Sequence, residues 1–125
     1  MRPAPVDPRS LNAAERAVLE HILASDFTGA SELRSQIGQA EVVATWSPGS
    51  MSVDLRVLEP ASRAPLNAGL VPVGAQVLDE LGEYVGELLA WIEDGMLAGL
   101  EYAWITDEMP AALPTVERIR LTPDL

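Results

Sequence analysis

Two glutamates in an apolar part of the chain are the residues best placed to do chemistry. Glu87 and Glu101 lie within residues 84–105, where β-prone side chains flank Asp94-Gly95. A carboxylate among apolar side chains can have a raised pKa and act as a general acid or base. More often it sits at a sheet margin or pairs with an arginine, and the sequence offers Arg34, Arg56, Arg118 and Arg120. The sequence favours this structural interpretation.

Other residue types that serve catalysis or metal binding are scarce. His21 is the single histidine, and the residues that share its helical face offer no second metal ligand. The chain has no cysteine and no lysine, which excludes thiolate ligands and Schiff-base chemistry. No glycine-rich phosphate loop lies between a strand and a helix. We therefore predict no catalytic, cofactor-binding or metal-binding residues and favour a protein that is not an enzyme.

The net charge limits the partners that the protein can have. The formal charge is −11, and recognition of phosphate depends on clustered basic residues. The charge therefore disfavours nucleic acid and anionic membranes as partners. It is compatible with a basic protein partner and also with general solubility. Mimicry of DNA is disfavoured because the acidic residues are interleaved with apolar ones.

Length and hydropathy indicate one globular domain. The chain has 125 residues, and 48% of them are hydrophobic. The first ten residues contain no apolar segment of the kind found in signal peptides. No apolar run approaches the ~18 residues that span a bilayer. We expect a cytoplasmic protein.

Two helices are expected to follow a flexible arm at residues 1–9. Asn12 and Glu15 have the spacing of a capping box, and an apolar helical stripe follows, which predicts a helix over residues 13–25. Thr28 can cap a second helix over residues 29–37, and Gly38 stands where a left-handed C-terminal residue belongs.

The rest of residues 10–125 is expected to complete a single α+β domain, with a mainly antiparallel sheet of about five strands. Alternation over residues 51–58 predicts a half-buried strand, and weaker patterns place others at 42–46 and 71–78. Asp94-Gly95 predicts the turn of a central hairpin. Residues 59–69 are expected to form a mobile loop, and residues 106–125 an irregular strap.

A two-residue turn at Asp94-Gly95 assigns each hairpin side chain to a face. It pairs Trp91 with Ala98, Leu89 with Leu100 and Glu87 with Tyr102. Trp91, Tyr102 and Trp104 then share a face with Glu87, whereas Glu101 lies on the opposite face. Both faces are apolar, and two helices can cover only one of them.

The function therefore depends on whether these aromatic residues are ordinary core or an exposed patch. We favour a protein-interaction or self-associating module, either a homodimer or a complex with a basic partner. Its interaction residues are predicted to be Trp91, Tyr102, Trp104, Glu87 and Glu101. The alternative is a small-molecule-binding protein or enzyme with a pocket between the sheet and residues 59–69, where Glu87 or Glu101 is the polar group.

Short motifs spread over most of the chain resemble those of a known group of proteins. They are Leu11-Asn12-x-x-Glu15, Asp26-Phe27-Thr28-Gly29-Ala30, Leu33-Arg34-x-Gln36, Ser52-Val53-Asp54-Leu55, Asp94-Gly95-x-Leu97-x-x-Leu100-Glu101 and Leu113-Pro114. The sequence is similar to small α+β proteins of unknown function from bacteria, largely actinobacteria. In similar sequences the turn before the second strand often carries cysteines, whereas here it is Trp46-Ser47-Pro48-Gly49-Ser50. The resemblance implies this order of elements and no particular activity.

Overall fold

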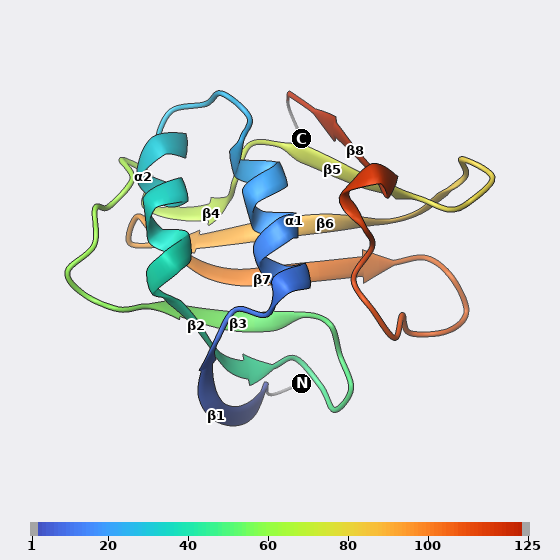
Figure 1. Ribbon diagram of the computed structural model, residues 1–125, viewed down its shortest axis with the longest axis horizontal. Helices are drawn as coiled ribbons and strands as arrows, with labels where there is room; N and C mark the ends of the chain where they lie inside the picture. The colour runs from blue at the N-terminus through green and yellow to red at the C-terminus, as the bar shows by residue number, and fades with distance from the viewer. Residues whose placement is uncertain (1–2, 124–125) are drawn as a thin grey trace.

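The computed structural model describes residues 3–123, in which eight strands form one sheet beside two helices (Figure 1). The helices are α1 (Ala13–Leu23) and α2 (Ala30–Gln36), and the 3-10 turns are η1 (Ile37–Gln39) and η2 (Val116–Arg118). The strands are β1 (Ala4–Ser10), β2 (Ala40–Thr45), β3 (Val53–Val57), β4 (Ala68–Leu70), β5 (Gly74–Leu78), β6 (Tyr84–Glu93), β7 (Met96–Trp104) and β8 (Ile119–Thr122).

The sheet is antiparallel throughout its described pairs. Its order is β1-β2-β3-β7-β6-β5-β8, and β4 pairs with the end of β6 that β5 leaves unpaired. Both helices lie across the same face of the sheet (Figure 1). The other face, called the open face below, has no helix over it in the described part of the chain. The predicted α+β class is thus confirmed, with eight strands instead of about five.

One additional strand, β1, occupies most of the segment predicted as a flexible arm. Prolines are tolerated in β1 because it is an edge strand, and its register shifts between Pro5 and Arg9. The Arg9 guanidinium donates to both carboxylate oxygens of Glu15, at 2.8 and 2.9 Å. Because Glu15 is only 3% exposed, this pair fixes β1 to the first turn of α1. Residues 1 and 2 of the predicted arm lie outside the described residues.

The predicted strap at residues 106–125 is irregular only in its first part. After η2 the chain forms β8, which pairs with β5 from Gly74 to Val77. β8 was hidden from prediction by its brevity and by the prolines around it. Residues 124 and 125 lie outside the described part of the chain.

The helices match their predicted positions closely. The capping box at Asn12 is present, with the Glu15 N–H donating to Asn12 Oδ1 at 2.8 Å and the Asn12 N–H donating to Glu15 Oε1 at 2.9 Å. Gly29, in the left-handed region at φ 93°, replaces Thr28 as the N-cap of α2, and Gly38 lies in the turn η1 without the left-handed conformation predicted for it. The two helices bury Val18, Leu19, Ile22, Leu23 and Leu33 against the sheet.

The central hairpin turns at Asp94-Gly95 as predicted. Asp94 has φ 53° and Gly95 has φ 74°, the positive values that a two-residue type I′ turn requires. A Cβ on Gly95 would also lie 2.5 Å from the Ala64 carbonyl oxygen, so the loop before β4 packs too closely for a larger residue.

The predicted hairpin register is wrong beyond the turn because the register shifts at Ala98. Glu93 pairs with Met96 and Ile92 with Leu97, but Trp91 pairs with Gly99 and Leu89 with Glu101. Such a bulge adds one residue to β7 and reverses the face of every later side chain.

The shift changes which hairpin residues lie together. Leu100 and Tyr102 face the helices with Leu88 and Ala90, and all four are buried. Glu101 instead joins Glu87 and Trp91 on the open face. The predictions that the two glutamates lie on opposite faces, and that Trp91 shares a face with Tyr102 and Trp104, were therefore wrong.

Candidate functional site: a pocket where β7 extends past β3

A pocket opens where β7 continues beyond the beginning of β3. The two strands pair only through Val53 with Leu100 and Asp54 with Gly99, so residues 101–104 have no strand beside them on this side among the described residues. The turn at residues 46–52 borders the resulting gap. Its Ser52 Oγ accepts the Tyr102 N–H at 2.9 Å, and Ser50 Oγ accepts the Ser52 N–H at 3.0 Å.

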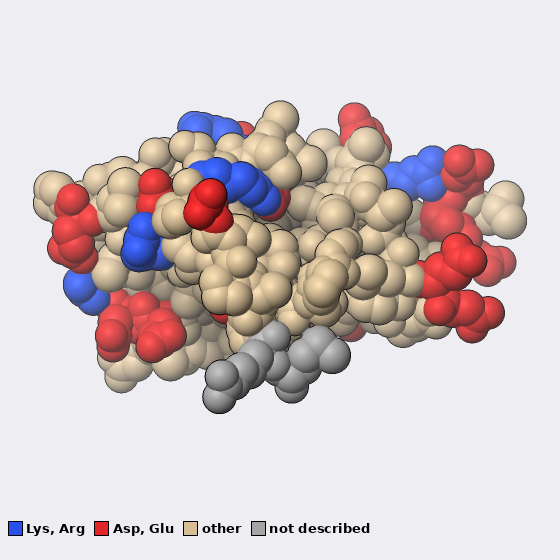
Figure 2. Space-filling view, turned by 90° about the horizontal axis from the view of Figure 1, so that it is seen from below, with Lys and Arg blue, Asp and Glu red and all other residues tan. Residues whose placement is uncertain are grey.

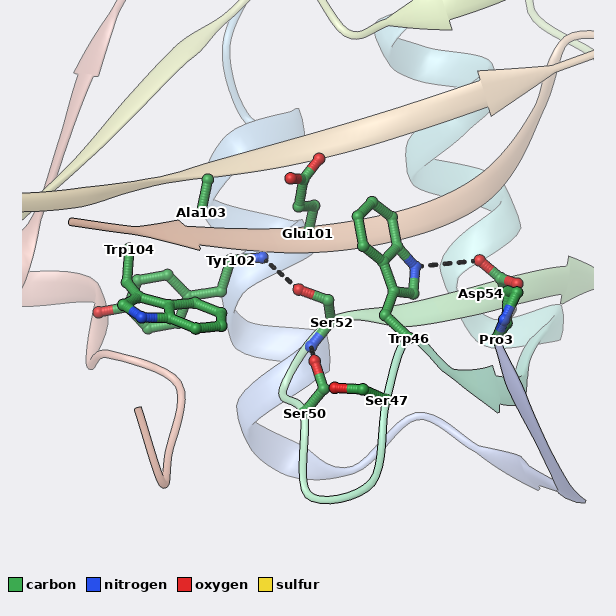
Figure 3. A pocket seen from close by; sticks show the side chains of 10 residues that line it. All are labelled: Pro3, Trp46, Ser47, Ser50, Ser52, Asp54, Glu101, Tyr102, Ala103 and Trp104. Carbon is green, nitrogen blue, oxygen red and sulfur yellow. Dashed lines mark hydrogen bonds between the residues drawn. The ribbon is translucent and has the colours of Figure 1, made fainter. Parts of the chain in front are cut away.

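We call this cavity the notch pocket. It measures about 630 Å³, which lies within the usual range for small-molecule sites. It is lined by Pro3, Trp46, Ser47, Ser50, Ser52, Asp54, Glu101, Tyr102, Ala103 and Trp104. In Figure 3, Trp104 and Trp46 stand at opposite sides of the serine hydroxyls, and the Glu101 carboxylate projects from β7 away from the turn that carries the serines.

Asp54 supplies the first carboxylate of the notch pocket. It lies on the polar side of β3, and the register with Gly99 places it on the open face. Trp46, just after β2, donates its indole Nε1–H to Asp54 Oδ1 at 3.1 Å (Figure 3). This bond orients both the carboxylate and the indole ring.

Glu101 supplies the second carboxylate, in a similar arrangement. Its Oε1 accepts the Nε1–H of Trp91 at 3.0 Å, across the pair of strands β6 and β7. Glu101 stands two residues along β7 from Gly99, the partner of Asp54, so the two acidic residues are diagonal neighbours whose Cα atoms are about 7–8 Å apart. Each carboxylate accepts one indole hydrogen, and an ionised carboxylate has further acceptor sites.

Neither Asp54 nor Glu101 forms a salt bridge within residues 3–123. The arginines described in the structure bind other groups: Arg9 binds Glu15, Arg16 binds Glu20, Arg34 binds the Leu23 carbonyl, Arg56 binds Glu41, Arg63 binds Glu59, Arg118 binds Glu80 and Arg120 binds Gln76. The predicted pairing of Glu101 with an arginine is therefore absent from the described residues. The notch pocket is thus an acidic site that holds no basic side chain from residues 3–123.

The other predicted interaction residues are divided between the pocket, the open face and the core. Trp104 lines the pocket and is 37% exposed. Tyr102 touches the pocket but is 7% exposed, and burial raises its pKa above the ordinary 10.0. Glu87 lies outside the pocket and accepts the Tyr84 hydroxyl at 2.8 Å. Desolvation, and secondarily this hydrogen bond, raises the pKa of Tyr84.

The loop at residues 59–69 does not border the notch pocket. Ala64 donates its N–H to the Gly95 carbonyl at 2.9 Å, and Arg63 Nη1 donates to the Asp94 carbonyl at 2.9 Å. These bonds anchor the loop to the hairpin turn. A cavity between the loop and α2 is lined by Ser35, Gln39, Pro60, Ala61 and Ser62, so neither Glu87 nor Glu101 belongs to it.

Sequence reasoning missed Trp46 and Asp54 as site residues. Asp54 falls on the polar side of the alternation that predicted the strand at residues 51–58, and Trp46 was noted only as part of a strand and its following turn. Their meeting with Glu101 depends on the bulge at Ala98 and on the pairing of β3 with β7, two features without a local sequence signal. A tryptophan and an aspartate flanking a serine-rich turn were the only available hint.

Comparison with known proteins provides no relative: no family, no curated protein and no solved structure matches this chain. Within residues 3–123, no cluster of three or more histidine, aspartate or glutamate side chains could hold a metal ion. No helix in the same range is both long and apolar enough to cross a membrane.

Proposed function

We propose that this protein is a binding module whose notch pocket takes a protonated organic cation, either a guanidinium or an ammonium group. The observation that carries the proposal is the pair Asp54 and Glu101, two carboxylates each held by an indole N–H and neither neutralised by an arginine within residues 3–123. A cation bound at either carboxylate, beside the Trp46 indole, would supply the missing partner.

The walls of the pocket favour an organic cation over a hydrated metal ion. Trp46 and Trp104 are partly exposed, and indole is the best aromatic partner for a cation, contributing about 0.5–2 kcal/mol. Ser47 and Ser50 add hydroxyl acceptors. Metal sites of the magnesium and calcium type use a denser set of oxygen ligands than this lining offers.

Charge on the open face as a whole, the pocket included, supports a cationic partner over a second copy of the chain. Among the strand residues that alternation places on the open face, the acidic ones are Glu41, Asp54, Glu87, Glu93 and Glu101, and the basic ones are Arg56 and Arg120. A symmetric dimer through this face would bring like charges together, which costs several kcal/mol. We therefore prefer a basic partner to the homodimer.

The proposal is tested by isothermal titration calorimetry with N-acetyl-arginine amide and N-acetyl-lysine amide. The neutral citrulline analogue has nearly the shape of the arginine probe and is expected not to bind. The variants E101Q and D54N can keep the indole hydrogen bond through the amide oxygen but lose the charge. A charged hydrogen bond contributes about 2 kcal/mol, so each variant should weaken binding about 30-fold.

E87Q is the matched control because Glu87 lies on the same face but outside the pocket. It should bind the probes as the wild type does. If both cations fail to bind, or if citrulline binds equally well, the proposal is wrong.

A further inference from the structure

We propose that the cation arrives as an arginine side chain on an extended segment of a partner protein, which lies across the notch pocket and the apolar rim beside it. This inference rests on the proposed function and specifies the source of the cation. The rim consists of Trp104, Ile105 and Met109, which are 37%, 66% and 41% exposed.

The rim begins at the pocket and follows the chain after β7. Trp104 lines the pocket, and Ile105 follows it directly, with its N–H donating to the Val85 carbonyl at 3.0 Å. The Met109 side chain lies over Gly49, in the turn that borders the pocket. A small free amine bound in the pocket would be too short to cover these three large apolar side chains. A peptide segment with apolar residues next to its cation could cover them.

The site also has room for an extended chain. No strand in the described part of the protein lies beside residues 101–104 on the side of the turn, where a serine hydroxyl takes the Tyr102 N–H. A strand edge of this kind is a common place for an extended peptide to bind. The pocket opens along this edge, so an arginine would enter it while its neighbours rest on the rim.

Charge around the rim favours a basic segment. Asp107 and Glu108 lie between Ile105 and Met109 and are exposed. Figure 2 shows acidic side chains at both ends of the molecule, and fewer basic side chains accompany them at the right-hand end, where Figure 1 places both the segment after β7 and the turn between β5 and β6. Opposite charges would steer a basic partner toward this end of the molecule.

The aromatic rings and carboxylates of the pocket suit an arginine side chain better than a lysine side chain. The guanidinium group is planar, stacks on indole rings and presents a fork of donors to carboxylate oxygens. The pocket offers two indole rings, Trp46 and Trp104, and two carboxylates that can accept such donors. The compact ammonium group of lysine would use only part of this arrangement.

The test compares a capped pentapeptide of sequence Thr-Val-Arg-Val-Thr with N-acetyl-arginine amide by calorimetry. The peptide is expected to bind at least tenfold more tightly than the small probe. The variants I105S and M109S should each weaken the peptide about threefold to tenfold and leave the small probe unchanged. L58S is the control, because Leu58 is 45% exposed but lies at the opposite end of β3 from the pocket.

The outcomes separate this inference from the proposed function. If the peptide and the small probe bind with equal affinity, and the rim variants change neither, the ligand is a free small cation; the inference is then wrong and the proposed function stands. If lysine replaces arginine in the peptide without loss, the preference for guanidinium is refuted. If nothing binds, the proposed function itself fails.

Discussion

Replacing Gln36 with leucine should destabilise the protein far more than its position in a short helix suggests. Gln36 in α2 is fully buried. Its Nε2 donates to the Ser62 carbonyl at 2.7 Å and to the Gly95 carbonyl at 2.9 Å, and its Oε1 accepts the Leu97 N–H at 2.9 Å. One side chain thus joins α2, the loop before β4 and the hairpin turn.

The cost of Q36L can be worked from these three bonds. Each contributes about 1 kcal/mol net, and the buried Leu97 N–H left without an acceptor adds about 1–3 kcal/mol. The Ser62 carbonyl is on an exposed residue and can bind water, and Gly95 retains the bond from Ala64, so only the Leu97 bond and its orphaned N–H count in full and the expected loss is about 2–4 kcal/mol. Typical domains have only about 5–15 kcal/mol of stability.

The assay is urea unfolding followed by tryptophan fluorescence and far-UV circular dichroism. Gln39 provides a matched control, because it donates to the Pro60 carbonyl of the same loop at 2.6 Å but at the surface. Q39L should cost about 1 kcal/mol or less, with an unchanged dependence on urea in both variants. If Q36L lowers the unfolding free energy no more than Q39L does, the three buried hydrogen bonds of Gln36 do not stabilise the fold as expected.

Three further predictions follow from the open face and the hairpin. W91F removes the indole donor to Glu101 and should weaken cation binding about fivefold by calorimetry, whereas the unfolding free energy changes little. G86A places a Cβ 2.5 Å from the Ala103 carbonyl oxygen, so β6 and β7 must separate, and urea unfolding should reveal a loss of about 1–3 kcal/mol. Burial raises the pKa of Tyr102 above 10.0, so the folded state holds this proton more tightly than the unfolded state does. The stability that this proton contributes is present below pH 10 and is lost as the pH rises through the pKa of Tyr102 in the folded state. Y102F should therefore lose less unfolding free energy at alkaline pH than the wild type. An unchanged pH dependence of the unfolding free energy in Y102F would refute the role given to Tyr102.

Local signals in the sequence were enough to predict most of the elements near the helices. The capping pair Asn12 and Glu15 marked the beginning of α1, and Asp94-Gly95 marked the hairpin turn. The alternation from Val53 to Val57 correctly predicted which side chains of β3 face the core. Each of these features depends on residues close together in the chain, and therefore leaves a readable pattern.

The site depends on features that leave no such pattern. The bulge at Ala98 places Glu101 on the open face and not on the face covered by the helices. The residue types around Ala98 give no pattern that would predict a bulge there. The register of β3 with β7 decides that β7 extends past its neighbour, and this register joins residues more than forty positions apart. The edge strands β1 and β8 were missed because the prolines within β1 and the length of β8, only 4 residues, hide strands that pair on one side only.

The most direct test of the notch pocket as a cation site is nuclear magnetic resonance of the indole N–H groups. The Nε1–H groups of Trp46 and Trp91 each donate to a pocket carboxylate, so both resonances report on what those carboxylates bind. Titration of the ¹⁵N-labelled protein with N-acetyl-arginine amide should shift both signals, which W46F and W91F would assign, and the citrulline analogue should shift neither. Unmoved indole signals at saturating arginine probe, or equal shifts with citrulline, would contradict the account.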